Sequence, residues 1–157
     1  MGQVYTIEFT FANFDIAGGD WDPFELRPPS PTPFSVVAVV IENFERKGDA
    51  EEEQIRWQIV RGHTVSGSGS TQVGNRLDDN DFNIGVIADR VSATVASGGS
   101  PEIIHAGVFN NRKGLHWWPT PEMRPKVDGG QTTLVIRFPA TLMQDHEMSG
   151  TIYFERL

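Results

Sequence analysis

Apolar and polar residues alternate strictly at both ends of this chain. From residue 5 to residue 11, every second position is aromatic or aliphatic (Tyr5, Ile7, Phe9 and Phe11). Ile152 and Phe154 repeat the pattern near the C-terminus. A period of two residues is that of a half-buried β-strand. Between the two ends, no segment keeps a helical repeat over three turns, so the sequence predicts an all-β fold.

Further segments have the composition of strands and are bounded by many of the 16 glycines and 10 prolines. Phe34 to Ile41 is nearly continuously apolar and β-branched, which predicts a strand covered on both faces. Residues 83 to 96 also fit a helical spacing, but their β-branched content favours one or two strands. The full set of expected strands is 4–13, 22–26, 34–41, 55–59, 83–96, 102–109, 115–118, 132–139 and 149–155.

Eight or nine strands without intervening helices must bury their apolar faces against one another. The sequence therefore predicts a two-sheet β-sandwich of the jelly-roll type. With 157 residues, the chain suits one domain covering residues 1–157, which would bury roughly 68 to 70% of its unfolded surface.

Charge and composition narrow the classes of partner. Thirteen basic and 21 acidic residues give a net charge of −8, which disfavours nucleic acid and anionic membranes as partners. The absence of cysteine excludes disulfides, thiolate nucleophiles and cysteine-ligated zinc. No apolar stretch approaches the ~20 residues of a membrane span, and the N-terminus lacks the pattern of a signal peptide. We therefore expect neither export by such a signal nor membrane insertion.

Three segments are interpreted as connections between strands. The prolines at positions 28 to 33 predict a stiff extended segment. The acidic residues 45 to 53 are most simply a solvated connection. The Gly/Ser tract 66–70 opens an irregular region that extends to about residue 81, where we expect a flexible or contacting loop.

No pattern of residues demands a reaction, a metal or a cofactor. None of the four histidines lies at a spacing that would place two imidazoles on one metal; they are His63, His105, His116 and His146. His105 lies in an apolar segment and is interpreted as a structural histidine with its hydrogen bonds satisfied. Asp20 with Asp22, and residues 78–81, could bind calcium, but aspartates that end strands and begin turns are the favoured interpretation.

The most informative surface candidates are aromatic. Consecutive residues of a strand face opposite sides, so at most one of Trp117 and Trp118 can enter the same core, and the other needs a partner. We name Trp117, Trp118 and the following Pro119 as candidate interface or ligand contacts. Trp21, between two aspartates in an expected loop, is a further candidate interface or ligand contact.

Four stretches resemble small proteins encoded among the structural genes of tailed phages and prophages. They are residues 51–56, residues 61–70, residues 118–125 and residues 148–155. The resemblance implies a virion protein, assembled in the bacterial host cytoplasm. For a jelly roll of this size, it implies a capsid decoration (cement) protein, a small capsid subunit or the base of a spike or fibre. It also implies a homotrimer that contacts the major capsid protein or another virion protein.

The expectation is thus a non-enzymatic phage structural protein that stabilises the head by bridging capsomers. The alternative from another class is a lectin-like carbohydrate-binding module that uses Trp21, Trp117 or Trp118 as stacking platforms. A β-sandwich hydrolase is a third, minor alternative, since carboxylate pairs can hydrolyse glycosides.

Overall fold

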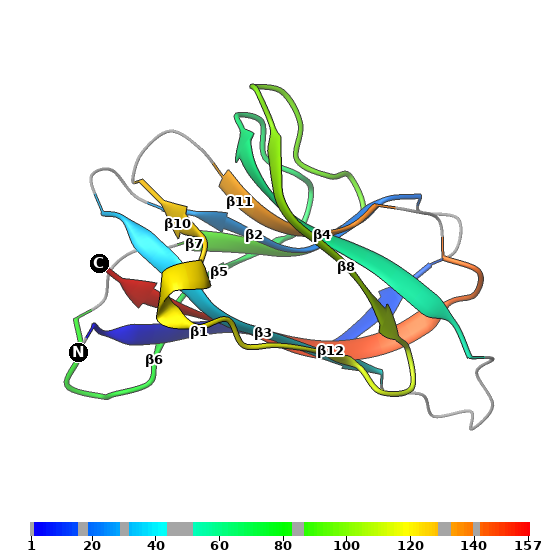
Figure 1. The fold of residues 1–157 in the computed structure, drawn as a ribbon, viewed down its shortest axis with the longest axis horizontal. Coiled ribbons are helices and arrows are strands. Elements are labelled where there is room, and N and C mark those ends of the chain that lie inside the picture. Colours follow the sequence, from blue (N-terminus) through cyan, green and yellow to red (C-terminus); the bar gives the residue numbers. More distant parts are fainter. Residues whose placement is uncertain are drawn as a thin grey trace.

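The computed structural model describes residues 2–15, 19–28, 32–43, 52–82, 87–128, 133–139 and 142–157. Within these ranges the chain forms twelve strands and one short 3-10 turn, η2 (Pro121–Met123) (Figure 1). The strands are β1 (Val4–Phe14), β2 (Trp21–Arg27), β3 (Phe34–Asn43), β4 (Gln54–His63), β5 (Ser70–Val73), β6 (Asn75–Arg76), β7 (Ile87–Ser92), β8 (Glu102–Asn110), β9 (Leu115–Trp117), β10 (Lys126–Val127), β11 (Thr133–Phe138) and β12 (His146–Arg156). The all-β prediction is confirmed, but eight or nine strands was too few.

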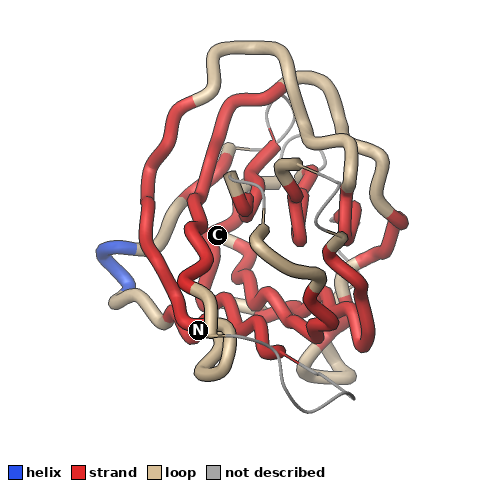
Figure 2. The backbone as a smooth tube through the Cα atoms, turned by 90° about the vertical axis from the view of Figure 1, so that its right-hand side faces the viewer, coloured by secondary structure: helices blue, strands red, loops and turns tan. Residues whose placement is uncertain are grey.

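The strands form two antiparallel sheets, so the predicted two-sheet sandwich is confirmed (Figure 2). Sheet A has the order β10-β3-β12-β1-β6, with β9 also paired to β3. Sheet B has the order β5-β7-β2-β11-β4-β8. The first four strands alternate between the two sheets, a crossing pattern on which jelly-roll-like sandwiches are built.

The two alternating ends of the chain lie side by side in sheet A. β1 pairs antiparallel with β12, and Ile7 lies opposite Ile152 while Tyr5 lies opposite Phe154. All four of these side chains are fully buried. Because residues opposite each other in a ladder share a face, one register places both apolar rows toward sheet B.

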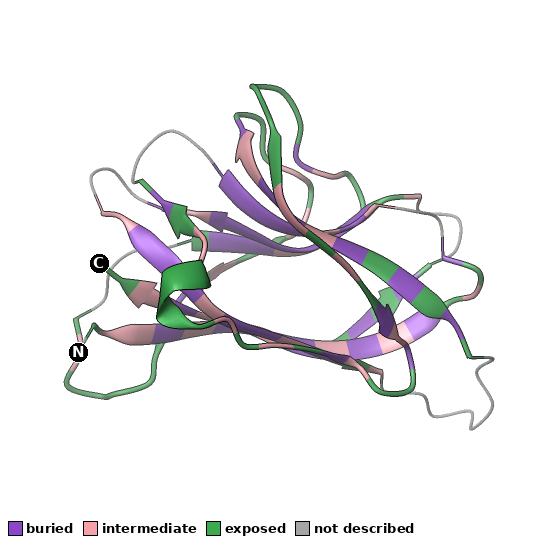
Figure 3. Cartoon of the chain, viewed as in Figure 1, coloured by how far each residue is buried: buried purple, intermediate pink, exposed green. Residues whose placement is uncertain are grey.

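Aromatic side chains join the two sheets across the core. Phe9 of sheet A lies 5.1 Å from Phe24 of sheet B, measured between ring centroids. Phe14 of sheet A lies 5.5 Å from Phe138 of sheet B. Each such buried ring contributes roughly 1.5 to 3 kcal/mol relative to an exposed one. The alternation between buried and exposed positions is visible along β4 (Figure 3), in which Ile55 and Trp57 are buried while Gln54 and Arg56 are exposed.

The Gly/Ser tract is a contacting loop, one of the two alternatives that the sequence left open. The region contains the short strands β5 and β6, and its first residues lie against sheet B. A Cβ on Gly67 would lie 2.4 Å from the Thr94 carbonyl oxygen, and a Cβ on Gly69 would lie 2.5 Å from that of Arg90. These glycines are therefore required by close backbone packing rather than by mobility.

The other two connections are only partly described. Residues 29–31 of the proline-rich segment and residues 44–51 of the acidic stretch lie outside the described residues. At the end of the acidic stretch, Glu53 is only 6% exposed, so the interpretation of the whole stretch as solvated is wrong at this residue. Of the expected strand 83–96, residues 87–92 form β7, and residues 83–86 lie outside the described part.

Candidate functional site

A buried polar cluster covers the side of sheet B that faces away from the core. Asp22 of β2 is fully buried and accepts two hydrogen bonds from Arg137 of β11, from Nε at 2.7 Å and from Nη2 at 3.0 Å. The same carboxylate accepts a bond from the Ala96 amide at 2.8 Å, and Arg137 Nη2 donates to the Ala96 carbonyl at 2.8 Å. Arg137 Nη1 lies 3.2 Å from His63 Nε2. The cluster therefore fastens the loop around Ala96 onto the sheet.

A second cluster lies further along the same side of sheet B. Glu25 is fully buried, and its Oε2 accepts a bond from the Gly67 amide at 2.8 Å. Its cross-strand neighbour Asp89 is paired with Arg27 at 2.8 Å and accepts a bond from Thr71 at 2.8 Å. Burial raises the pKa of Glu25, although the Gly67 amide opposes this change. These carboxylates hold β5 and the Gly/Ser tract in place.

The acidic residues considered for calcium are used for other purposes. The Asp22 carboxylate is occupied by Arg137 and by the Ala96 amide. In the other candidate, Asp78 Oδ1 accepts bonds from the backbone and side-chain nitrogens of Asn80, so the turn interpretation is confirmed there. Within the described ranges, no group of three or more histidine, aspartate or glutamate side chains is arranged to hold a metal ion.

The structure does not bring the histidines together. His63 lies beside Arg137, and His146 is fully buried with Nε2 at 2.6 Å from Glu53 Oε2. His116 pairs with Glu42 at 3.1 Å on the outer face of sheet A. His105 differs from the other three, because its ring makes aromatic contacts but no hydrogen bond with the described residues. The described residues thus supply none of the hydrogen bonds that its interpretation as a satisfied structural histidine requires, and that interpretation stays a prediction.

Trp21 is a core residue rather than a surface contact. Its side chain is 7% exposed, and its ring packs against Phe14 at 5.3 Å. Its Nε1 donates to the Asp15 carbonyl at 3.2 Å. Trp21 opens β2 instead of lying in a loop, so its ring faces the core and offers no free face for a ligand.

Trp117 and Trp118 point to opposite sides of sheet A, as their spacing predicts. Trp117 pairs with Val39 in the ladder between β9 and β3 and packs, half-buried, against the core. Trp118 is 62% exposed and lies over Tyr153, with 5.7 Å between ring centroids and 36° between ring planes. Pro119 follows it and is half-buried. The two neighbouring tryptophans thus belong to two different surfaces.

The first surface is the outer aromatic patch, which we define as Trp118 and Tyr153. Tyr153 points outward because its neighbours Ile152 and Phe154 are fully buried on the inner side. Five residues after Trp118, Met123 of η2 is 69% exposed, and η2 contains no buried residue. The strand alternation in β12 could have identified Tyr153 as outward-facing.

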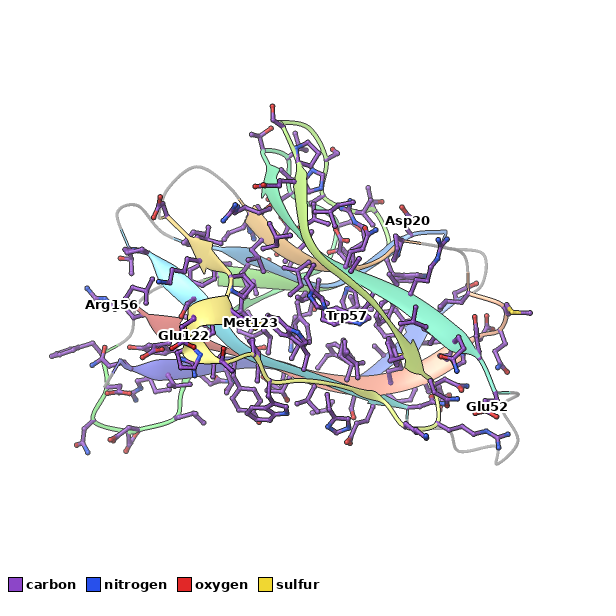
Figure 4. The ribbon with its side chains drawn as sticks, in the orientation of Figure 1. Asp20, Glu52, Trp57, Glu122, Met123 and Arg156 are labelled. Carbon is purple, nitrogen blue, oxygen red and sulfur yellow. The ribbon has the colours of Figure 1, made fainter. Side chains whose placement is uncertain are left out.

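The second surface is the aromatic hollow, which we define as the cavity between β8 and β9 lined by Trp57, His105 and Trp117. Trp57 points into the space between the two sheets (Figure 4). The ring centroid of His105 lies 4.8 Å from that of Trp57 and 5.4 Å from that of Trp117. The hollow has a volume of about 470 Å³. Burial lowers the pKa of His105, which favours the neutral form of its ring.

Comparison of the chain with models of protein families, with curated proteins and with solved structures finds no match in any of the three. Over the described residues, no helix has the length and apolar character needed to cross a membrane.

Proposed function

We propose that this chain is a non-enzymatic structural protein of a tailed-phage virion that decorates the capsid or forms part of it. The resemblance of residues 51–56, 61–70, 118–125 and 148–155 to proteins of that class supports the proposal. The observation that carries it is the outer aromatic patch, where a tryptophan that is 62% exposed is backed by a tyrosine ring.

The patch has the properties of an assembly contact. Tryptophan and tyrosine are the residues on which binding energy concentrates at protein interfaces. Trp118 is held against Tyr153, so little side-chain freedom remains to be lost when a partner covers it. A subunit that binds a shell across such patches stabilises the shell by mass action.

The partners follow from the same reasoning. We expect the patch to contact the major capsid protein or another virion protein, and the net charge of −8 suits a position outside the shell, away from packaged DNA. The homotrimer implied by the resemblance stays a prediction, which sedimentation equilibrium of the purified chain would measure.

The polar clusters are consistent with this role. Asp22, Arg137 and Glu25 form bonds that fasten loops onto sheet B. A framework with its loops tied down presents a surface of constant shape, and binding to it costs little ordering entropy.

The test is binding of the purified chain to shells that lack it. We expect Trp118→Ala to weaken co-sedimentation more than tenfold, since an interface tryptophan of this kind contributes about 2 kcal/mol or more. Leu77→Ala is the matched control, because Leu77 is 60% exposed but lies just after β6, at the other edge of sheet A. Equal binding by the Trp118 variant and the parent would refute the assignment of the patch.

A second experiment tests the class of protein. Virions that lack the chain should lose resistance to heat or to EDTA, and electron microscopy should show heads missing density. Heads of unchanged composition and resistance would contradict a decorating role.

The carbohydrate-binding module stays as a second candidate because one observation favours it. The aromatic hollow combines indole and imidazole rings in a cavity of small-molecule size. Its ligand chemistry can be argued separately from the virion role, since the outer aromatic patch lies on the other side of sheet A.

A further inference from the structure

The aromatic hollow is built from three elements that are distant in sequence. Trp57 comes from β4, His105 from β8 and Trp117 from β9. β8 is the last strand of sheet B, β9 lies at the edge of sheet A, and the turn that joins them lines one end of the cavity. The hollow is therefore an opening between the edges of the two sheets that is bounded at one end.

Its walls offer flat apolar surfaces. The rings of Trp57 and Trp117 lie 5.9 Å apart and are nearly perpendicular, at 69°. The ring of His105 lies close to both. Trp57 is only 3% exposed, whereas Trp117 is half-buried, so Trp117 presents the larger free ring face.

The same walls carry nitrogen atoms that have no hydrogen-bond partner among the described residues. Neither indole Nε1 and neither ring nitrogen of His105 makes a hydrogen bond with the described residues. Trp57 Nε1 is also not fully enclosed, although the residue as a whole is buried. Indole N–H groups in such places normally find an acceptor. The hollow therefore offers donors to a ligand that carries acceptor oxygens.

Gly107 keeps the edge of Trp57 within reach of the cavity. A Cβ at this position would lie 2.7 Å from Trp57 Nε1, so any other residue would force the indole to move. The glycine lies on β8 directly opposite Trp57 in the ladder. The position of the Trp57 indole thus depends on the absence of a side chain at residue 107.

The charge around the hollow differs from that of the chain as a whole. Although the net charge is −8, no aspartate or glutamate is among the described residues that line the hollow, whereas Lys113 does line it. Two lining residues, His116 and Asn110, are bonded to Glu42 and Glu52. Ligand oxygens there would meet the Lys113 ammonium group and the indole N–H groups. The neutral ring of His105 adds a donor and an acceptor without a fixed charge.

We infer that the aromatic hollow binds a neutral saccharide, with a sugar ring against the face of Trp117 and hydroxyl oxygens accepting bonds from the indole N–H groups. A pyranose ring carries C–H faces that stack on an aromatic ring and hydroxyls around its rim, which matches this distribution of surfaces and donors. A proline-rich peptide offers similar groups, but it needs an extended groove, and the β8–β9 turn limits the hollow at one end.

The inference goes beyond the virion role and can fail independently of it. Trp117 belongs to the hollow and Trp118 to the outer aromatic patch, so two neighbouring substitutions separate the two proposals. Trp118→Ala should reduce binding to shells and leave saccharide binding within about twofold of the parent. Trp117→Ala should do the opposite.

The experiment starts from a glycan array of neutral oligosaccharides probed with the intact chain. The strongest hit is then titrated by tryptophan fluorescence and calorimetry against the parent, Trp117→Ala, Trp117→Phe and Trp118→Ala. We expect Trp117→Ala to weaken binding about tenfold or more, the loss expected for one aromatic stacking contact. Trp117→Phe keeps the core contact but lacks the N–H, and should give an intermediate loss. Circular dichroism confirms that each variant is folded.

The inference would be overturned by an array without any bound saccharide, by unchanged affinity in both Trp117 variants, or by binding of proline-rich peptides in place of saccharides. Loss of binding in Trp118→Ala alone would also overturn it, because the sugar would then lie on the outer aromatic patch. Gly107→Ala gives an independent check: the added methyl group should displace Trp57 and weaken binding in a chain that still contains every ring of the hollow.

Discussion

Removing one partner of the buried ion pair between Asp22 and Arg137 is expected to destabilise the sandwich strongly. The Asp22 side chain is fully buried, and that of Arg137 is only 12% exposed. Asp22→Asn would leave a nearly buried guanidinium group without its counter-charge. Arg137→Met would remove two of the hydrogen bonds that the Asp22 carboxylate accepts. Of the donors described above, it would keep the Ala96 amide. Breaking such a pair from one side costs about 3 to 5 kcal/mol.

This free energy can be converted to a melting temperature. In a domain of this size, 1 kcal/mol shifts the midpoint of thermal unfolding by roughly 2 to 4 °C. Each single variant should therefore melt about 6 to 20 °C below the parent. The double variant contains no buried charge at this place, so it should lose much less than the sum of the two single variants.

Urea unfolding followed by tryptophan fluorescence would measure the free energy of unfolding of all four proteins in the cycle. We expect a coupling energy of about 2 kcal/mol or more between the two positions. Arg61→Met is the matched control, because Arg61 and Glu102 form an ion pair with side chains 37% and 65% exposed, and such pairs contribute at most about 1 kcal/mol. Two single variants whose effects add to that of the double variant would show that the pair is not coupled.

Two further predictions concern the Gly/Ser tract and the carboxylate beneath it. Because burial raises the pKa of Glu25, the folded state holds this proton more tightly than the unfolded state, and stability is lost as pH rises above the ordinary value of 4.5. Glu25→Gln should therefore be more stable than the parent near neutral pH, with an advantage that disappears below that value; melting curves that differ equally at every pH would contradict this. Gly67→Ala should cost about 1 to 3 kcal/mol, because the new methyl group would meet the Thr94 carbonyl oxygen. An unchanged melting temperature would show that the backbone there moves freely.

The long strands could be predicted from the sequence because their residues alternate. Tyr5, Ile7 and Phe154 show which faces of β1 and β12 are buried, but alternation does not reveal that these two strands pair with each other. The short strands β5, β6 and β10 could not be predicted, because two to four residues carry no measurable period. Their positions follow from neighbouring strands and from bonds such as that between Gly67 and Glu25.

The candidate surfaces were predictable only in part. Strand geometry predicts that Trp117 and Trp118 face opposite sides, and the structure confirms it. The association of Trp117 with Trp57 and His105 depends on how β4, β8 and β9 meet, which no local pattern encodes. The Asp22–Arg137 pair joins residues 115 positions apart, so its carboxylate resembled an ordinary turn residue in the sequence.

The position of β12 in sheet A has a consequence for biosynthesis. β12 lies between β1 and β3, so these two early strands share no neighbour until residues 146–156 have been made. During translation, each would wait with an open hydrogen-bonding edge, and open edges of apolar strands invite pairing with other chains. A chain that ends before residue 146 would therefore be prone to aggregate, whereas a released chain that contains residues 146–156 can close sheet A.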